Sequence, residues 1–180
     1  MADPHAPAVR SHHQMAREIR TERLHLRPPC ADDLEAVFTV HADPRTWRHR
    51  PDLVMTSREE AADLLGRWGQ DWDDHGIGYF VVRTLDGRTI GFTGLRRSTV
   101  DDQDVLNLYY RFAPEAQGRG YAREAVRAAI DWARASRIEL PIVAVVAPNN
   151  PASARLATAL GLVRDPAGTT CDHDLYRLEL

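Results

Sequence analysis

The sequence predicts an α/β domain built around one mixed, mostly antiparallel sheet. Short segments alternate apolar and polar residues between turn signals, as strands do. Longer segments repeat apolar residues at helical spacing. Residues 142–146 form an almost wholly apolar run, which is typical of a strand buried on both faces. The chain has 180 residues, 43% of them hydrophobic, and no internal repeat, so we expect a single core.

The first elements are predicted to be one strand and two helices. Leu24 and Leu26 alternate with charged residues before two prolines, as in a short strand. Acids at positions 32 and 33 suit the positive end of a helix dipole, and apolar residues follow at helical spacing. The second helix starts near Thr56 or Ser57, each of which offers a capping box. Its apolar stripe comprises Ala61, Leu64, Leu65, Trp68 and Trp72.

Three antiparallel strands are expected next. Residues 79–83 and 89–97 alternate like strands, and Asp86-Gly87 between them supplies the positive φ angles of a tight hairpin. Residues 105–112 form the third strand after an acidic loop at 101–104, and Pro114 stops it.

The rest of the chain alternates helices and strands. A glycine-rich turn leads into a helix that ends near residue 136, and its narrow face of small apolar residues suits close packing on a sheet. The buried strand 142–146 precedes a helix that ends at Leu160, because Gly161 terminates it. Residues 175–178 form the last strand. We therefore expect a sheet of about six to seven strands flanked by about four helices.

Composition excludes several function classes. A formal charge of −3 does not favour nucleic acid as a partner. All 23 basic residues are arginine, so no lysine can form a Schiff base or bind a phosphate in a P-loop. Cys30 and Cys171 show no metal-ligand or disulfide spacing, and no apolar run approaches the length of about 18 residues that spans a membrane. A cytoplasmic protein without a metal fits best.

Residues 1–20 are predicted to be a mobile tail, and residues 21–180 the folded domain. The tail contains His5, His12 and His13, which could form a metal-binding tract, but their spacing is irregular and chain termini are usually disordered.

The segment 117–122 carries the clearest chemical signal. Gln117-Gly118-Arg119-Gly120-Tyr121-Ala122 connects a strand to a long helix. Free N–H groups at a helix start, with no Cβ on the glycines, form a cradle for a phosphate or diphosphate. Glycine also serves a tight turn for steric reasons alone. A dinucleotide-binding fold would need a third glycine at position 123, which is arginine.

Several segments together resemble the GNAT superfamily of acyltransferases. Residues 112–122 resemble its Gln/Arg-x-x-Gly-x-Gly/Ala signature, and Asn150-Pro151-Ala152-Ser153 with Leu160-Gly161-Leu162 resembles the next segment. Residues 21–27 and 91–95 are similar to the branch that acetylates ribosomal-protein N-termini. The resemblance implies a GNAT fold, a twisted sheet that splays open to admit acetyl-CoA.

The resemblance also assigns the binding residues. Main-chain groups of Tyr110, Arg111 and Phe112 would pair with the pantetheine arm as an added strand. The turn from Gln117 to Ala122 would hold the diphosphate, and Asn150 and Ser153 would line the far side of the split. Asn150 could equally be only a helix cap. Arg119, Arg123 and Arg155 could contact phosphates or be solvated surface.

The sequence departs from the superfamily at two chemical positions. Asn107 stands where many relatives carry a glutamate base, and Ala157 where many carry a tyrosine that protonates the thiolate. Ser153 is then the candidate proton donor. A water held by Asn107, or an acid of the 101–104 loop, could relay the amine proton.

Aromatic residues and histidines leave two further interpretations open. Trp47, Trp68, Trp72 and Tyr79 could wall the acceptor pocket or belong to the core. His41 and His49 could act as bases or be structural.

These features predict an N-acetyltransferase that moves an acetyl group from acetyl-CoA to a primary amine, either a protein N-terminus or a small amine. A catalytically silent acyl-CoA sensor or scaffold is the alternative, as is an enzyme for another acyl-CoA such as succinyl-CoA. A homodimer is possible, and no membrane partner is expected.

Overall fold

The computed structural model describes residues 17–178 and confirms the predicted α/β class. Eight strands form one sheet in the order β1-β2-β3-β4-β5-β6-β8-β7. Neighbouring strands are antiparallel except β5 and β6, which are parallel. The strands are β1 (Ile19–Arg20), β2 (Leu24–Arg27), β3 (Tyr79–Thr84), β4 (Thr89–Val100), β5 (Gln103–Phe112), β6 (Ile142–Val146), β7 (Leu162–Asp165) and β8 (Asp174–Leu178).

Two of these strands were not predicted from the sequence. β1 lies at the end of the segment predicted to be a tail, where Ile19 pairs with Leu26. β7 is an edge strand of four residues that pairs only with β8 among the described strands. Both are too short for an alternating pattern to distinguish them from loops. Residues 1–16, with the three histidines of the predicted tail, lie outside the described residues.

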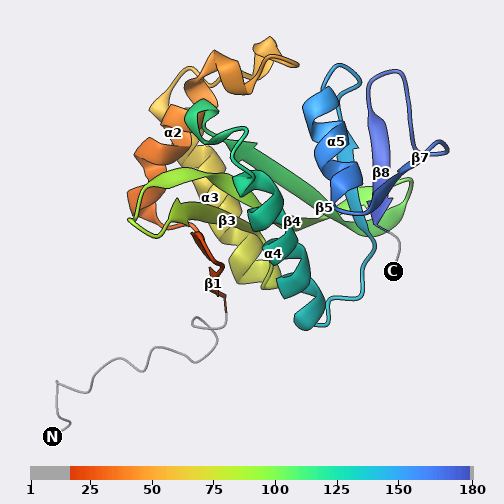
Figure 1. The fold of residues 1–180 in the computed structure, drawn as a ribbon, viewed down its shortest axis with the longest axis horizontal. Helices are drawn as coiled ribbons and strands as arrows, with labels where there is room; N and C mark the ends of the chain where they lie inside the picture. Colours follow the sequence, from red (N-terminus) through yellow and green to blue (C-terminus); the bar gives the residue numbers. More distant parts are fainter. Residues whose placement is uncertain (1–16, 179–180) are drawn as a thin grey trace, which may run out of the picture.

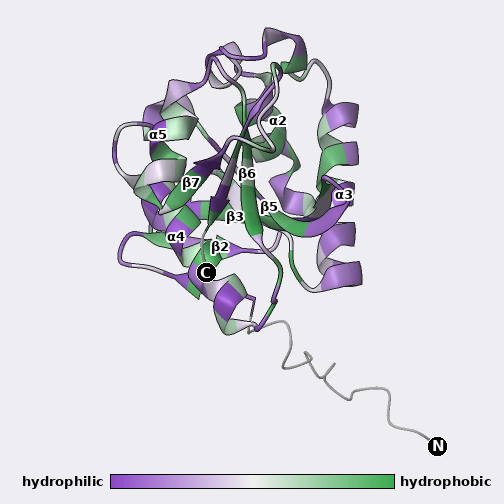
Figure 2. Ribbon diagram, turned by 90° about the vertical axis from the view of Figure 1, so that its right-hand side faces the viewer, coloured by the Kyte–Doolittle hydropathy of each residue, from purple (hydrophilic) through white to green (hydrophobic). Residues whose placement is uncertain are grey.

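Within residues 17–178, four α-helices cover the two faces of the sheet (Figure 1). α2 (Leu34–Ala42) and α3 (Arg58–His75) share one face and pack with Tyr79, Val81 and Phe92. α4 (Tyr121–Ala135) and α5 (Pro151–Ala159) lie on the other face, where α4 presents the predicted stripe of small residues. The start of α3 is capped by Ser57, whose Oγ accepts a hydrogen bond from the Glu60 N–H. Figure 2 shows hydrophobic residues gathered on the central strands and hydrophilic residues on the outer helix faces.

The segment 101–104 is a tight turn rather than the predicted four-residue loop. Asp101 and Asp102 adopt φ angles of 50° and 58°, and β5 already begins at Gln103. Mirror-image turns of this kind match the twist of the strands they connect. β4 and β5 therefore form a ribbon that continues to Val100, three residues beyond the predicted end of the strand.

A buried ion pair fixes the start of α2. The Arg27 guanidinium donates to both carboxylate oxygens of Asp33, at 2.8 Å and 2.7 Å. The Cys30 N–H also donates to this carboxylate. Asp33, predicted to favour the helix dipole, thus acts mainly as the partner of Arg27. Burial raises the pKa of Asp33, but the bonds from Arg27 and Cys30 outweigh it and hold the pKa below its usual value.

Within residues 17–178, no helix is both long and apolar enough to cross a membrane. The two cysteines are free and exposed.

Candidate active site

The sheet opens between β5 and β6. These parallel strands pair only at Leu106–Ile142 and Asn107–Val143 and then diverge, whereas β5 pairs with β4 along its whole length. The Leu106 N–H donates to Pro141 on the β6 side, and the Ala113 N–H donates to Ile90 on the β4 side. Because backbone groups alternate along a strand, those of Tyr110 and the N–H of Phe112 face the opening. The main-chain N–H and C=O of Arg111 face β4. They therefore do not face the opening, where the sequence analysis expected them to pair with the pantetheine arm.

The turn before α4 presents free amides to this opening. It follows a short 3-10 helix, η4 (Pro114–Ala116), and ends at Gly120, the N-cap of α4. Gly118 and Gly120 adopt φ angles of +73° and +78°, which residues with a Cβ rarely adopt. Within the described residues, the N–H groups from Gly118 to Arg123 have no hydrogen-bond acceptor. A Cβ on Gly118 would meet no atom within 4 Å, so the turn is open to a ligand.

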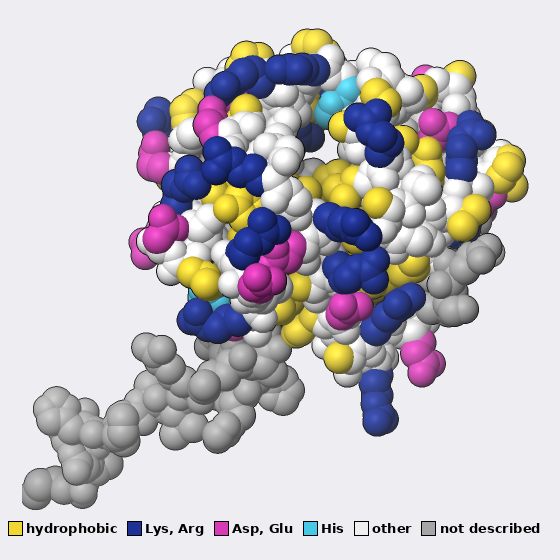
Figure 3. All heavy atoms as spheres, viewed as in Figure 1, with side chains coloured by type: hydrophobic (Ala, Val, Ile, Leu, Met, Phe, Trp, Pro, Cys, Tyr) yellow, Lys and Arg dark blue, Asp and Glu magenta, His cyan; other side chains and the backbone are white. Residues whose placement is uncertain are grey.

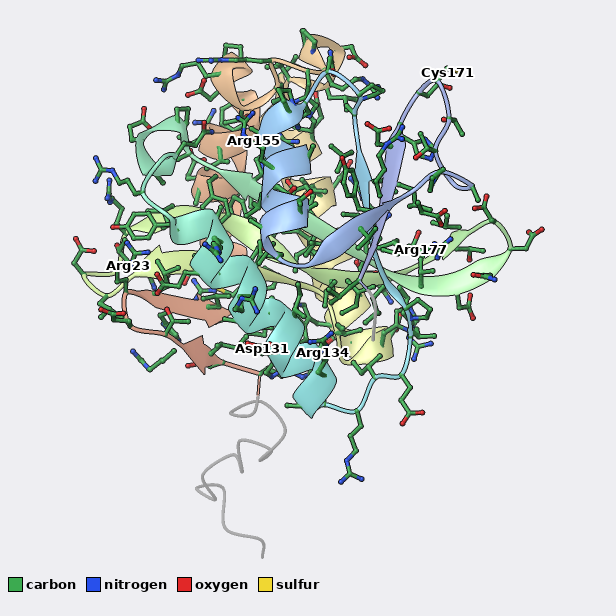
Figure 4. All side chains as sticks on the ribbon, turned by 45° about the vertical axis from the view of Figure 1, so that its right-hand side comes forward. Arg23, Asp131, Arg134, Arg155, Cys171 and Arg177 are labelled. Atoms are coloured by element: carbon green, nitrogen blue, oxygen red, sulfur yellow. The ribbon has the colours of Figure 1, made fainter. Side chains whose placement is uncertain are left out.

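The opening residues of the domain hold this turn in place. The Glu124 carboxylate accepts hydrogen bonds from Thr21 Oγ1 (2.6 Å), Arg23 N (3.1 Å) and Arg23 Nε (2.7 Å). Arg23 also donates to the Arg119 carbonyl at 3.0 Å and lies over the Tyr121 ring. Partial burial raises the pKa of Glu124, yet these bonds outweigh it and lower the pKa. Figure 4 labels Arg23 beside the start of α4. The Thr21-Glu22-Arg23 motif therefore has a structural role that sequence reasoning missed.

A cavity of about 580 Å³ lies where the turn, the split and α5 meet. It is lined by most of the predicted site: Tyr110, Arg111, Phe112, Gln117, Gly118, Gly120, Tyr121, Ala122, Asn150 and Ser153. Figure 3 shows the molecule hollowed at this place, with hydrophobic atoms at the floor and arginine side chains around the rim. Arg123 lines the cavity, but Arg119 and Arg155 do not. Arg155 lies exposed on α5, as Figure 4 shows.

The family model described as an acetyltransferase (GNAT) domain matches residues 23–163, most of the folded chain and all of the turn that precedes α4. The chain belongs to the GNAT acetyltransferase family. It is accordingly an acyltransferase, and the fold expected from the sequence resemblance is confirmed.

Relatives share both sequence and fold with this GNAT protein. The uncharacterized protein YkkB of Bacillus subtilis (strain 168) is 33% identical over 148 residues, which cover 79% of this chain and 83% of YkkB. An acetyltransferase structure from Agrobacterium tumefaciens str. C58 has a TM-score of 0.77 and 28% identity, over 91% of this chain and 94% of that one. RimL, a ribosomal L7/L12 α-N-protein acetyltransferase solved with coenzyme A, has a TM-score of 0.72. It is 16% identical and covers 89% of this chain and 96% of its own, so it shows the shared fold alone.

Asn150 and Ser153 form one hydrogen-bonded unit at the start of α5. Asn150 Oδ1 accepts from the Ser153 N–H at 3.2 Å, so the side chain caps the helix. This bond orients Asn150 Nδ2, which donates to Ser153 Oγ at 3.0 Å. The Ser153 hydroxyl faces the cavity, and its own proton has no acceptor among the described residues. Asn150 therefore caps a helix and also holds the serine in position.

The groups that the sequence analysis proposed as relays of the amine proton, Asn107 and the acids of residues 101–104, lie apart from the cavity. Asn107 does not line it, and Asn107 Oδ1 is buried without a hydrogen-bond partner in the described part of the chain. Tyr109, the next residue on that face of β5, lines the cavity instead. Ala157 is fully buried in the core. Asp104 lies seven residues from Arg111 along β5, roughly 23 Å away in an extended strand. Neither Asn107 nor the 101–104 turn is thus placed to relay a proton.

The aromatic residues divide between core and site. Trp68, Trp72 and Tyr79 are buried in the core, which excludes them as walls of the acceptor pocket. His41 is buried, and its Nδ1 donates to the Val37 carbonyl while its Nε2 accepts from the Tyr109 hydroxyl. Burial lowers the pKa of His41 to about 4. His49 lines the cavity, and burial together with Arg111 and Arg50 lowers its pKa.

Tyr110 contributes a hydroxyl that sequence reasoning missed. Its main chain was expected to face the split, but its side chain also reaches across to α5 and donates to the Ser153 carbonyl at 3.1 Å. This bond joins the two sides of the opening. No sequence signal indicates it, because residues 110 and 153 are 43 positions apart.

Proposed function

We propose that this GNAT protein transfers an acetyl group from acetyl-CoA to a primary amine by direct transfer in a ternary complex. The observation that carries the proposal is the row of unpaired amides from Gly118 to Arg123, beside a strand whose edge is free. The first N–H groups of a helix have no acceptor within the helix, and the glycines leave them open, so this turn favours an anionic ligand. RimL, which has the same fold, was solved with coenzyme A.

Each part of the site would hold one part of the coenzyme. The amides from Gly118 to Arg123 would bind the diphosphate, where the α4 dipole adds a favourable field. The free groups of Tyr110 and Phe112 would pair with the pantetheine amides as an added strand. No side-chain base is required for an α-amine, because its pKa near 7.7 to 8.0 leaves a useful neutral fraction at pH 7.

Ser153 would donate the proton that the leaving thiolate takes. Its oxygen accepts a hydrogen bond from Asn150 Nδ2, and its proton has no acceptor among the described residues. Ser153→Ala is expected to lower kcat about 10-fold, less than the usual effect of a general acid, because a thiol of pKa near 8.5 leaves easily. Steady-state thiol release would measure this. Asn150→Ala should lower kcat in the same direction, and an unchanged kcat in Ser153→Ala would remove the serine from the mechanism.

Thiol release from acetyl-CoA with a panel of N-terminal peptides, polyamines and aminoglycosides tests the function itself. We expect acceptor-dependent release with at least one class. Tight binding of acetyl-CoA in calorimetry, without release for any acceptor, would instead favour an acyl-CoA sensor or scaffold. The observation that favours a sensor or scaffold is the absence of both a glutamate at position 107 and a tyrosine at position 157.

A further inference from the structure

One wall of the cavity carries an arginine that the chemistry above does not use. Along β5, Tyr110 and Phe112 face α4 and α5, while Tyr109 and Arg111 face α2 and the segment that follows it. Arg111 nevertheless lines the cavity, one residue from the main-chain groups proposed to hold the pantetheine. Its side chain thus lies on the side from which an acceptor would approach.

The guanidinium of Arg111 is fixed by neutral partners. Nη1 donates to the Thr46 carbonyl, and Nε donates to the Tyr109 hydroxyl at 3.2 Å. The Tyr109 hydroxyl donates in turn to His41 Nε2 at 2.8 Å. The guanidinium carbon lies over the Trp47 ring, 3.2 Å from its centroid. Because these contacts already fix the Arg111 side chain, it would lose little conformational entropy when a ligand binds.

The charge of Arg111 is not neutralised by any carboxylate of residues 17–178. Among the described residues, Arg111 has no ion pair, although it is half-buried. Asp43 and Glu115, which are near Thr46 and Arg111 in the sequence, are both paired with Arg45. Arg48 and His49 line the same cavity and add no negative charge. A half-buried cation without a counter-ion is costly unless a ligand supplies one.

We infer that Arg111 binds a carboxylate of the acceptor, so the substrate is an amine that carries a negative charge close to its amino group. An amino acid, or a peptide whose first residue is acidic, has this chemistry. The planar guanidinium has an Nη2 group with no acceptor in the described part of the chain, and a carboxylate is the group it binds best. The inference rests on the proposed function, since it names the acceptor of the same site.

Matched acceptors test the inference directly. One pair is a short peptide that begins with Asp and the same peptide beginning with Asn; the other is 4-aminobutyrate and 4-aminobutyramide. We expect the wild-type protein to favour the acid of each pair by about 30-fold in kcat/KM, as a charge-assisted hydrogen bond allows. Arg111→Gln should reduce that ratio to about 2-fold or less, and Arg111→Lys should give an intermediate ratio, since it keeps the charge but not the planar fork.

Controls separate recognition from a merely structural clamp. Arg50→Gln removes one positive charge from the same segment outside the cavity, so it should keep the wild-type ratio. Equal losses for acid and amide in Arg111→Gln, or no acid preference in the wild type, would overturn the inference. So would a preference for succinyl-CoA over acetyl-CoA that Arg111→Gln abolishes, because the carboxylate would then belong to the acyl donor.

A binding measurement keeps this result distinct from failure of the proposed function. Calorimetry with saturating CoA measures the affinity of each acid and amide without turnover. Preferential binding of the acids that depends on Arg111, without any thiol release, would sustain the anion site and refute the transferase. Thiol release without a preference for acids would sustain the transferase and refute the anion site. The absence of a preference in both binding and turnover also contradicts the inference.

Discussion

Gly118→Asp is expected to weaken the binding of acetyl-CoA about 100-fold. The added carboxylate would stand in the open space above the amides, where the diphosphate is proposed to lie. Two like charges about 4 Å apart near a protein surface repel by about 4 kcal/mol before salt screens them. This repulsion is larger than the free energy that corresponds to a roughly 100-fold loss of affinity. Titration calorimetry with acetyl-CoA at low and high salt would measure the loss, and high salt should reduce it.

Gly118→Asn is the matched control for this substitution. Asn and Asp have nearly the same shape, and both tolerate the left-handed conformation that Gly118 adopts at φ +73°. Asn should therefore cost less than about 10-fold in affinity, since it adds strain but no charge. Equal affinities of the Asp and Asn variants, with both correctly folded, would place the diphosphate somewhere other than this turn.

Acid is expected to destabilise the fold through His41, by about 2 kcal/mol between pH 6.5 and pH 4.5. In the folded state, burial lowers the pKa of His41 to about 4, so the ring stays neutral there. In the unfolded state the ring titrates near 6.5 and binds a proton first. The unfolded chain thus binds more protons across this window, and the free energy of unfolding falls as the pH falls. Above pH 6.5 the effect is absent.

Denaturant unfolding of the wild type and His41→Phe at both pH values measures this effect. Phe removes the titrating ring but leaves the Tyr109 hydroxyl without its acceptor, so it lowers stability by a constant amount. The difference between the two proteins should shrink by about 2 kcal/mol at pH 4.5. His75→Asn, at the exposed end of α3, should keep the wild-type response. Parallel pH profiles of the wild type and His41→Phe would contradict a neutral buried His41.

Much of the fold follows from local patterns. The apolar run at Ile142–Val146, the hairpin between β3 and β4 and the small-residue face of α4 were all predicted and are all observed. In the hairpin turn, Gly87 has the expected positive φ of 90° but Asp86 does not. Each depends on neighbours within a few residues, where spacing and turn chemistry act directly. The edge strands β1 and β7 were missed because their pairing depends on distant partners rather than on their own composition.

The candidate site also has parts that local sequence predicts and parts that it does not. The turn from Gln117 to Ala122 could be predicted because its glycines and the helix start are contiguous in the sequence, and this is also why the family resemblance is strongest there. Asn107 was misplaced because the cavity begins only where β6 diverges from β5, and Asn107 still pairs with Val143 while Tyr109 lies beyond the last pair.

The amino-acid sequence by itself determined the glycine turn, the capped helices and the six longer strands, since these arise from backbone conformations that nearby residues dictate. Only the tertiary structure decided that Arg23 holds Glu124, that Tyr110 reaches Ser153, and that Arg111 lies in the cavity without a counter-ion. Those contacts join segments 43 to 101 positions apart. Whether a charged side chain has a counter-ion depends on all the elements packed around it, so it cannot be predicted from one segment of the sequence.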